Sequence, residues 1–347
     1  PEKLDLDQYP GKQFWSQIDL YADVKTRIKQ FRKLRKLMIS QHLDVPVEKI
    51  KFKEHHMCHS YYAYYASPIR NEPVLSFTAD GFDKDGKSKI LMQTDEALLG
   101  RLYRFITLNL KMRPLEDEYK VMGLAPYASE HHWRKPYEIF KELLEVDGYN
   151  IKLKNKPKDF FFYYQKRLQS FRFDAIAGGL QKYLEEVVVQ WVSNAIELTG
   201  VGNVVFSGGV SMNVKAMMEV SQIPSLNKIY VPPSGADESL CIGAAYQEAS
   251  KSLESKDVQP LVHAYLGAEY SREEIKKFIL DESIASGYNI VENISTDDIA
   301  LCISQGAIIG LFNGKMEFGA RALGARSIIA DPRSPDTVKR INYKIKN

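Results

Sequence analysis

The sequence predicts an α/β fold in which short buried strands alternate with helices. Two apolar runs, residues 72–79 and 203–206, end in turn-forming residues: Asp80-Gly81 after the first and Ser207-Gly208-Gly209 after the second. A long helical pattern over residues 176–198 lies between them. Strands that alternate with helices are typical of layered α/β domains, because each strand buries its apolar faces against helices.

The first hundred residues are predicted to contain two helices and several strands. Apolar residues recur at helical spacing over residues 23–38, and seven basic side chains share that helix. No aromatic pattern suited to base stacking accompanies them, which favours a solvated basic face over a nucleic-acid patch. The other expected elements are a strand over 49–53, a helix over 54–66, and strands over 72–79, 88–93 and the region after Leu99.

The rest of the chain continues the alternation. Asp174 is the expected N-cap of the helix over 176–198, which Thr199-Gly200 ends. Residues 147–173 are rich in Lys, Phe and Tyr without clear periodicity, and we expect an insertion there. The further expected elements are helices from about 213, over 240–250, 271–280 and 336–346, strands over 203–206, 228–231 and 307–312, and a linker over 251–257.

Composition excludes several classes of protein. The 347 residues carry a net charge of +3, which is too small to indicate a nucleic-acid partner. Three well-separated cysteines, Cys58, Cys241 and Cys302, argue against a disulfide framework and favour a reducing cytoplasm. No apolar run approaches the roughly 18 residues that a membrane span needs, so we expect no membrane partner.

Two histidines form the first candidate site. His55 and His59 are four residues apart on the predicted helix over 54–66, so they share one face and can bind one divalent metal. A zinc protease would need Glu directly after the first histidine, where this chain has His56. Asp80, at the end of the next strand, is a plausible carboxylate ligand. The alternative is that both histidines have only a structural role.

Two glycine-containing loops are candidates for ligand contacts. Ser207-Gly208-Gly209-Val210 and then Asn213 join a buried strand to a helix, a geometry that can cradle phosphate or serve only as a turn. Asp237 follows a Pro/Ser/Gly loop and precedes a helix of small residues, so it can bind metal, orient a nucleotide or cap the helix. Lys120, within residues 118–127, is either a surface charge or a phosphate contact.

An arginine-rich loop follows the last predicted strand. Within residues 314–333, Arg321, Arg326 and Arg333 lie among glycines and small apolar residues. Guanidinium groups bind phosphate and carbamoyl oxygens through paired hydrogen bonds, and glycines let a ligand approach the backbone. The pattern favours an anion site over a solvated loop.

Together these segments resemble one family, the NodU/CmcH-type O-carbamoyltransferases of nodulation factors and antibiotics. The matching segments are residues 55–59, 80–81, 119–127, 208–213, 237–245 and 314–333. The resemblance implies an actin/hexokinase/Hsp70-like (ASKHA) domain followed by part of a smaller α/β domain that handles carbamoyl phosphate. It also implies an enzyme that transfers a carbamoyl group from carbamoyl phosphate, via carbamoyl-adenylate and ATP, to the hydroxyl of a small-molecule acceptor.

The resemblance also implies roles for individual residues. The metal ligands and catalytic residues would be His55, His59, Asp80 and Asp237, with iron as the expected metal and Mg²⁺ possible with ATP. ATP would contact Gly208, Gly209, Val210, Asn213 and Lys120. Carbamoyl phosphate would contact Arg321, Arg326 and Arg333. Where the family has Pro, this chain has Ala320.

The expected domains are residues 1–250, an N-terminal carbamoyltransferase domain without its first strands, and 251–347, the start of the C-terminal domain. Two other functions remain open. Threonylcarbamoyl transfer to tRNA fits the first domain but leaves the Arg321–Arg333 segment unexplained. A non-catalytic ATP-binding actin-like regulator fits the glycine turns but not the histidine and aspartate set.

Overall fold

The computed structural model of the protein describes residue 19 and residues 21–78, 80–82, 88–92, 98–281 and 286–346. The chain divides into two compact units, Pro1–Glu54 and His55–Asn347. Within the described residues, no helix is both long enough and apolar enough to cross a membrane.

The first unit contains the predicted basic helix, α2 (Val24–Leu43). Asp23 caps its N-terminus by accepting a hydrogen bond from the Thr26 N–H at 3.1 Å, and Asp44 ends it in the left-handed conformation. The prediction of a strand over residues 49–53 is wrong. After Pro46 the chain forms a short 3₁₀ turn, η2 (Val47–Lys49), in which the N–H groups of Lys49 and Ile50 donate to the carbonyls of Pro46 and Val47.

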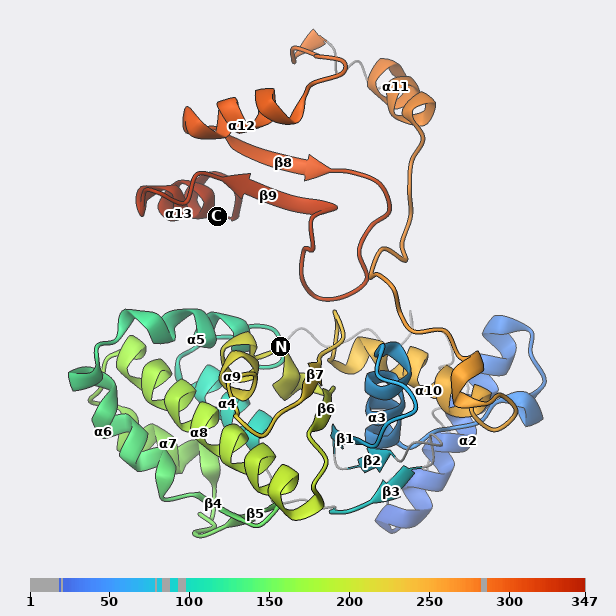
Figure 1. Cartoon of the computed structure of the whole chain (residues 1–347), viewed down its shortest axis with the longest axis vertical. Coiled ribbons are helices and arrows are strands. Elements are labelled where there is room, and N and C mark those ends of the chain that lie inside the picture. Colours follow the sequence, from blue (N-terminus) through green and yellow to red (C-terminus); the bar gives the residue numbers. More distant parts are fainter. Residues whose placement is uncertain are drawn as a thin grey trace. The chain divides into compact units, whose positions relative to one another are not determined.

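The second unit is built on a five-stranded sheet whose strand order is β3-β2-β1-β6-β7 (Figure 1). Its strands are β1 (Val74–Phe77), β2 (Asp80–Phe82), β3 (Ser88–Ile90), β6 (Asn203–Phe206) and β7 (Lys228–Tyr230). The first three strands form an antiparallel meander, whereas β6 runs parallel to both β1 and β7. The parallel strands therefore end at the same edge of the sheet, and the loops after them start there.

Helices cover both faces of this sheet (Figure 1). Side chains alternate along the strands, so Leu75 and Phe206 face the larger core, which α4 and α8 complete. Val74 and Val205 face the smaller core beside α3. The helices up to residue 257 are α3 (His55–Ala66), α4 (Leu99–Asn109), α5 (Glu118–Leu124), η3 (Ala125–Tyr127), α6 (Glu130–Lys141), α7 (Phe160–Leu168), α8 (Phe173–Thr199), η4 (Gly209–Met212), α9 (Val214–Val220), η5 (Asp237–Ser239), α10 (Leu240–Ala249) and η6 (Ser255–Asp257). The predicted α/β class is confirmed.

Two further sequence predictions are wrong. The region after Leu99 is the helix α4 and not a strand, because Leu99, Leu102 and Ile106 recur at helical spacing and are buried together. Asp174 lies inside the first turn of α8, where it pairs with Arg172 at 2.9 Å, and is not the N-cap. Gly200 does end α8 in the left-handed conformation, as predicted.

The segment predicted as an insertion has regular structure. Strands β4 (Leu144–Asp147) and β5 (Asn150–Leu153) form a hairpin, and α7 follows. Ile151, Tyr164 and Leu168 are buried in the larger core. The aromatic residues of this segment therefore pack against α4, α6 and α8, and Tyr183 of α8 donates a hydrogen bond to the Leu144 carbonyl at 3.3 Å.

Helices α3 and α10 approach each other closely at Gly243. A Cβ atom at this position would lie 1.9 Å from the carbonyl oxygen of Cys58, so only glycine permits the contact. On its other side, α3 is bonded to the sheet, since the Ser60 hydroxyl donates to that of Ser76 at 2.8 Å. Helix α3 is thus fixed between the sheet and α10.

Beyond η6 the chain forms α11 (Arg272–Asp281), α12 (Thr296–Ser304), a hairpin of β8 (Ile308–Phe312) and β9 (Arg326–Ala330), α13 (Asp336–Ile341) and the π-helical turn η8 (Asn342–Lys346). The sequence predicted α11, β8 and the final helical segment. Of the three predicted arginines, Arg321 lies in the loop between β8 and β9, Arg326 begins β9, and Arg333 follows it.

Gly243→Ala should separate α3 from α10. We expect the free energy of unfolding to fall by about 1–3 kcal/mol, because the added methyl group overpacks a backbone contact. Urea denaturation measures the change. Gly123→Ala is the matched control, since Gly123 lies in α5 with no heavy atom within 4 Å of the added carbon, and its stability should stay the same or rise. Equal stabilities of the two variants would contradict the close-contact interpretation.

Candidate metal centre

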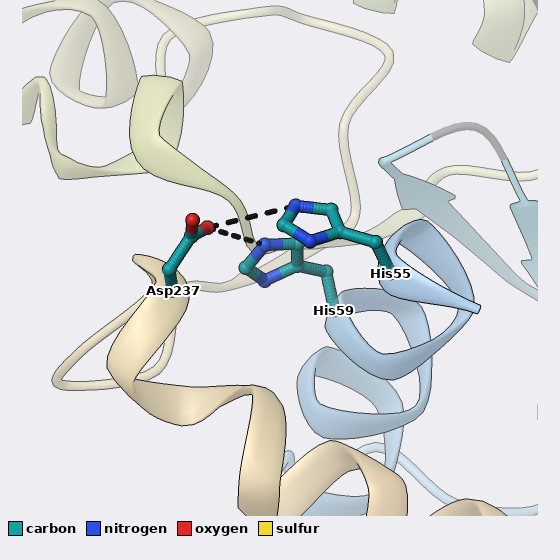
Figure 2. Close-up of side chains that lie close together, drawn as sticks. All are labelled: His55, His59 and Asp237. Atoms are coloured by element: carbon teal, nitrogen blue, oxygen red, sulfur yellow. Dashed lines mark hydrogen bonds and ion pairs between the residues drawn. The ribbon is translucent and has the colours of Figure 1, made fainter. Parts of the chain in front are cut away.

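The two predicted histidine ligands lie on the first turns of α3. The helix begins at His55, and residues 58–60 and 62–66 are buried where it packs on the sheet and α10. His59 is therefore buried, with 2% of its side chain exposed, whereas the side chain of His55 is 47% exposed. Their rings lie 4.9 Å apart at nearly a right angle. One nitrogen of each imidazole is directed to the same point (Figure 2).

Asp237 approaches the two histidines from the start of η5, directly before α10. Its Oδ1 atom lies 3.3 Å from Nε2 of His59 and 3.6 Å from Nε2 of His55 (Figure 2). The candidate ligand atoms of the three residues all lie within 4.8 Å of one another. The Asp237 side chain is 75% exposed, so this cluster is accessible from solvent.

These three residues fit a divalent metal ion. Two imidazoles and one carboxylate are a common donor set for zinc and for non-haem iron, and the remaining coordination positions stay open for substrate. Burial lowers the pKa of His59, His55 lowers it further, and Asp237 opposes the shift. A lowered pKa keeps the imidazole neutral, which is the form that binds metal. The fourth predicted ligand, Asp80, belongs to β2, but its side chain lies outside the described part of the structure.

The predicted glycine turn adjoins this cluster. Gly208 has a φ of 96°, a left-handed conformation that glycine tolerates, and it connects β6 to η4. Its N–H donates to the carbonyl of Gly235 at 2.6 Å, which joins the glycine turn to the loop that precedes Asp237. Ser207 contacts both the histidine helix and the aspartate loop. Its hydroxyl lies 3.1 Å from Nδ1 of His59 and 3.1 Å from the Gly235 carbonyl oxygen.

The other residues predicted to contact ATP have partners within the fold. Asn213 caps α9 by accepting from the Ala216 N–H, and its amide also pairs with that of Gln181 in the interior. Lys120 forms an ion pair with Asp117 at 2.8 Å on the surface. Val210 packs against the larger core. Contacts of these three residues with ATP therefore stay predictions.

The three predicted arginines have different partners. The Arg326 guanidinium stacks on Phe312 and donates to backbone carbonyls of Ala268, Asn313, Gly314 and Ala325. Arg333 is paired with Asp331 two residues earlier. The Arg321 guanidinium carbon lies 4.1 Å from the centre of the Tyr119 ring. Arg326 and Arg333 thus organise the backbone around them, which leaves Arg321 as the strongest of the three candidates for an anion contact.

A buried carboxylate organises the arginine-rich loop. Oε1 of Glu317 accepts hydrogen bonds from the N–H groups of Leu323, Ala325 and Arg326, at 2.7, 3.1 and 3.1 Å. Backbone donors, its own N–H first and then that of Leu323, lower the pKa of Glu317 to about 2. Glu317 is therefore charged at neutral pH and fixes the loop that presents Arg321.

Comparison with known proteins decides the family. The family model described as "Carbamoyltransferase N-terminus" matches residues 19–246, and that described as "Carbamoyltransferase C-terminus" matches residues 300–347. The chain belongs to the carbamoyltransferase family. The resemblance predicted from the motifs is thereby confirmed, whereas the predicted boundary near residue 251 stays a prediction.

Relatives of this chain occur in archaea and bacteria. An uncharacterized protein of Methanocaldococcus jannaschii is 30% identical over 96% of this chain and 60% of its own length. Nodulation protein NolNO of Sinorhizobium fredii is 29% identical over 98% of this chain and 55% of its own length. Nodulation protein NolO of Bradyrhizobium diazoefficiens is 32% identical over 66% of this chain and 43% of its own length. The chain spans about half the length of these relatives.

The sequence analysis missed two residues that organise the candidate sites. Ser207 was visible only as the first residue of a glycine turn, and its contact with His59 joins residues 148 positions apart. Glu317 was visible within the arginine-rich segment, but the hydrogen bonds it accepts depend on the loop conformation. Its position among several arginines, which Asp331 shares, is the only signal in the sequence that pointed to it.

Removal of one metal ligand should abolish tight metal binding. We expect Asp237→Ala and His59→Ala each to lower Zn²⁺ affinity by more than about 100-fold, since loss of a group that merely orients a ligand already costs about 10- to 100-fold. Titration of the metal-free protein against a chromophoric chelator measures this. His131→Ala, on the exposed side of α6, is the control and should retain one ion per chain. Wild-type affinity in both ligand variants would rule out this site.

Glu317→Gln should loosen the arginine-rich loop. A neutral amide is a weaker acceptor for three backbone donors, so amide hydrogen exchange over residues 318–328 should become faster at pH 7. In the wild type, this carboxylate stabilises the loop fully above a pH of about 4.5, and the contribution is lost as the pH falls towards 2. Glu273→Gln, an exposed residue of α11, is the control. Unchanged exchange in Glu317→Gln would show that the loop does not depend on this carboxylate.

Proposed function

We propose that this chain carries out ATP-dependent transfer of a carbamoyl group from carbamoyl phosphate, via carbamoyl-adenylate, to the hydroxyl group of a small molecule. The observation that supports this most directly is the convergence of His55, His59 and Asp237 beside the Ser207–Gly209 turn in a chain of the carbamoyltransferase family. The candidate metal ligands and the glycine turn proposed to bind phosphate are therefore adjacent. That is where an activated carbamoyl group and its acceptor need to meet.

The proposed reaction has three steps. Hydrolysis of carbamoyl phosphate releases phosphate and carbamate. A carbamate oxygen then attacks the α-phosphorus of ATP and displaces pyrophosphate, which gives carbamoyl-adenylate. Finally the acceptor oxygen attacks the carbamoyl carbon, AMP leaves, and the hydroxyl proton passes to a base. Adenylation is needed because carbamate itself is a poor electrophile.

The residues have separate roles in this proposal. His55, His59, Asp237 and the predicted ligand Asp80 would hold a divalent ion, which we propose to be iron, and Mg²⁺ could accompany ATP. When bound, the ion would supply Lewis-acid chemistry, lowering the pKa of the acceptor hydroxyl and polarising the carbamoyl oxygen. The exposed carboxylate of Asp237 would orient the acceptor side of the site.

The glycine turn is the proposed nucleotide contact. Apart from its own chain neighbours, no heavy atom of the described residues lies within 4 Å of the position where a Cβ of Gly209 would be, so a ligand can reach the backbone there. Parallel strands β1 and β6 end at this edge, and such edges are where ligands of α/β sheets bind. The mixed sheet with helices on both faces is compatible with the proposed ASKHA fold of this domain.

Carbamoyl phosphate is proposed to contact Arg321. The Glu317 carboxylate holds the backbone of its loop, so the guanidinium is presented from a fixed base. The carbamoyltransferase match, which includes residues 300–347, favours this function over threonylcarbamoyl transfer to tRNA and over a non-catalytic regulator. The names of the nodulation relatives point to no particular acceptor, and the acceptor class proposed here is only a hydroxyl compound.

The function is tested with full-length protein, ATP and labelled carbamoyl phosphate. Carbamoyl-adenylate should appear by mass spectrometry, together with one phosphate and one pyrophosphate per adenylate. Arg321→Lys should slow its formation by about 10- to 100-fold, the equivalent of one charged hydrogen bond, and leave ATP affinity unchanged. Arg272→Lys, on exposed α11, is the control. Absence of adenylate in the wild type would overturn the proposed donor chemistry, and a wild-type rate in Arg321→Lys would overturn the role of Arg321.

A further inference from the structure

The hydroxyl of Ser207 is buried between His59 and the loop that carries Asp237. It follows β6 directly, and 4% of the residue is exposed. Its Oγ atom lies 3.1 Å from Nδ1 of His59 on one side and 3.1 Å from the Gly235 carbonyl oxygen on the other. Both contacts are within hydrogen-bond distance. The carbonyl requires the hydroxyl to donate, whereas the role of the hydroxyl towards His59 depends on the tautomer of the imidazole.

The number of hydrogens limits which of these groups can donate. A serine hydroxyl has one hydrogen, and a carbonyl oxygen can only accept. If Ser207 donates to Gly235, then the contact with His59 is a hydrogen bond only when Nδ1–H donates to Ser207. A neutral imidazole that carries its proton on Nδ1 has a free lone pair on Nε2. We propose that Ser207 is a positioning residue that holds His59 in the Nδ1–H tautomer, so that Nε2 is available to bind metal.

This assignment makes Nε2 of His59 an acceptor that faces the Asp237 carboxylate. In the Nδ1–H tautomer, Nε2 of His59 and Oδ1 of Asp237 are two acceptors 3.3 Å apart. Two acceptors at that distance repel each other unless a cation or a proton lies between them. The arrangement that satisfies Ser207 therefore prepares the facing pair for a metal ion. The inference rests on the proposed metal centre and adds the residue that orients one of its ligands.

The acceptor on the other side of Ser207 is also fixed. The Gly235 carbonyl accepts from the Gly208 N–H at 2.6 Å. A Cβ at Gly235 would lie 2.2 Å from the Ser211 hydroxyl, so a side chain at this position would displace Ser211. Asp237 is only two residues further along this loop. One hydroxyl thus connects the orientation of His59 with the loop that positions Asp237.

The Nε2–H tautomer would give a different set of hydrogen bonds. With the proton on Nε2, His59 would donate to Asp237, and Ser207 would donate to Nδ1 and leave Gly235 to the Gly208 N–H alone. The two tautomers have different imidazole nitrogen shifts and couplings. A long-range ¹H–¹⁵N correlation spectrum of the metal-free full chain separates them, and the His59 signals are assigned by their loss in His59→Asn.

We expect the Nδ1–H tautomer in the wild type and a shift towards Nε2–H in Ser207→Ala, because Nδ1 then has no acceptor while Asp237 remains. Zn²⁺ affinity of Ser207→Ala should fall by about 10- to 100-fold. Ser211→Ala is the matched control. Ser211 is also buried, and its hydroxyl donates to the Gly208 carbonyl at 2.8 Å on the same turn, but in this structure it has no bond to His59. This variant should keep the wild-type tautomer and affinity.

Three results would overturn the role of Ser207. They are an Nε2–H tautomer in the wild type, an unchanged tautomer in Ser207→Ala, and an equal loss of Zn²⁺ affinity in Ser211→Ala. If the proposed metal centre is wrong, the wild type would bind no Zn²⁺, but the tautomer of His59 could still change in Ser207→Ala. The tautomer measurement therefore tests the inference independently of the proposed function.

Discussion

The backbone contact between α3 and α10 at Gly243 is the constraint on which the candidate site depends. His55 and His59 belong to α3, and Asp237 begins the turn that leads directly into α10. Ligand atoms on two helices can converge within 4.8 Å only if the helices themselves are close. Because Gly243 has no side chain, the axis of α10 can approach the Cys58 carbonyl, and the carboxylate reaches the imidazoles.

The sheet places the glycine turn beside the histidine helix. Strands β1 and β6 are parallel, so the turn after β6 emerges at the edge beside the start of α3. Gly208 is bonded there to Gly235, and Ser207 lies between Gly235 and His59. The glycine turn and the aspartate loop are thus one hydrogen-bonded structure and not two separate motifs. A change in the conformation of either loop would therefore alter both the candidate metal ligands and the proposed nucleotide contact.

The arginine-rich segment follows a different physical principle. A charged carboxylate, Glu317, accepts backbone hydrogen bonds from the loop, and Arg326 donates to several backbone carbonyls. These contacts use opposite charges to satisfy backbone groups that a glycine-rich loop would otherwise leave to water. Arginines that look equivalent in the sequence therefore have different partners. Arg326 donates to backbone carbonyls at the base of the loop and Arg333 pairs with Asp331 beyond β9, whereas Arg321 has no backbone partner among the described residues.

Local patterns determined much of what the sequence alone could predict. The four-residue spacing of His55 and His59, the turn at Gly208-Gly209 and the helix that ends at Gly200 all depend on neighbours within one or two turns, so they were legible. The region after Leu99 was mistaken for a strand, because a short apolar run suits a strand or a helix until its packing against α8 is known. Asp237 was only one candidate among several acidic residues until a family resemblance selected it. The backbone bonds of Glu317 join residues only six to nine positions apart, but they depend on the conformation of their loop. The approach of Asp237 to His59 and the contacts of Ser207 with His59 and Gly235 join distant segments, whose geometry only tertiary packing decides.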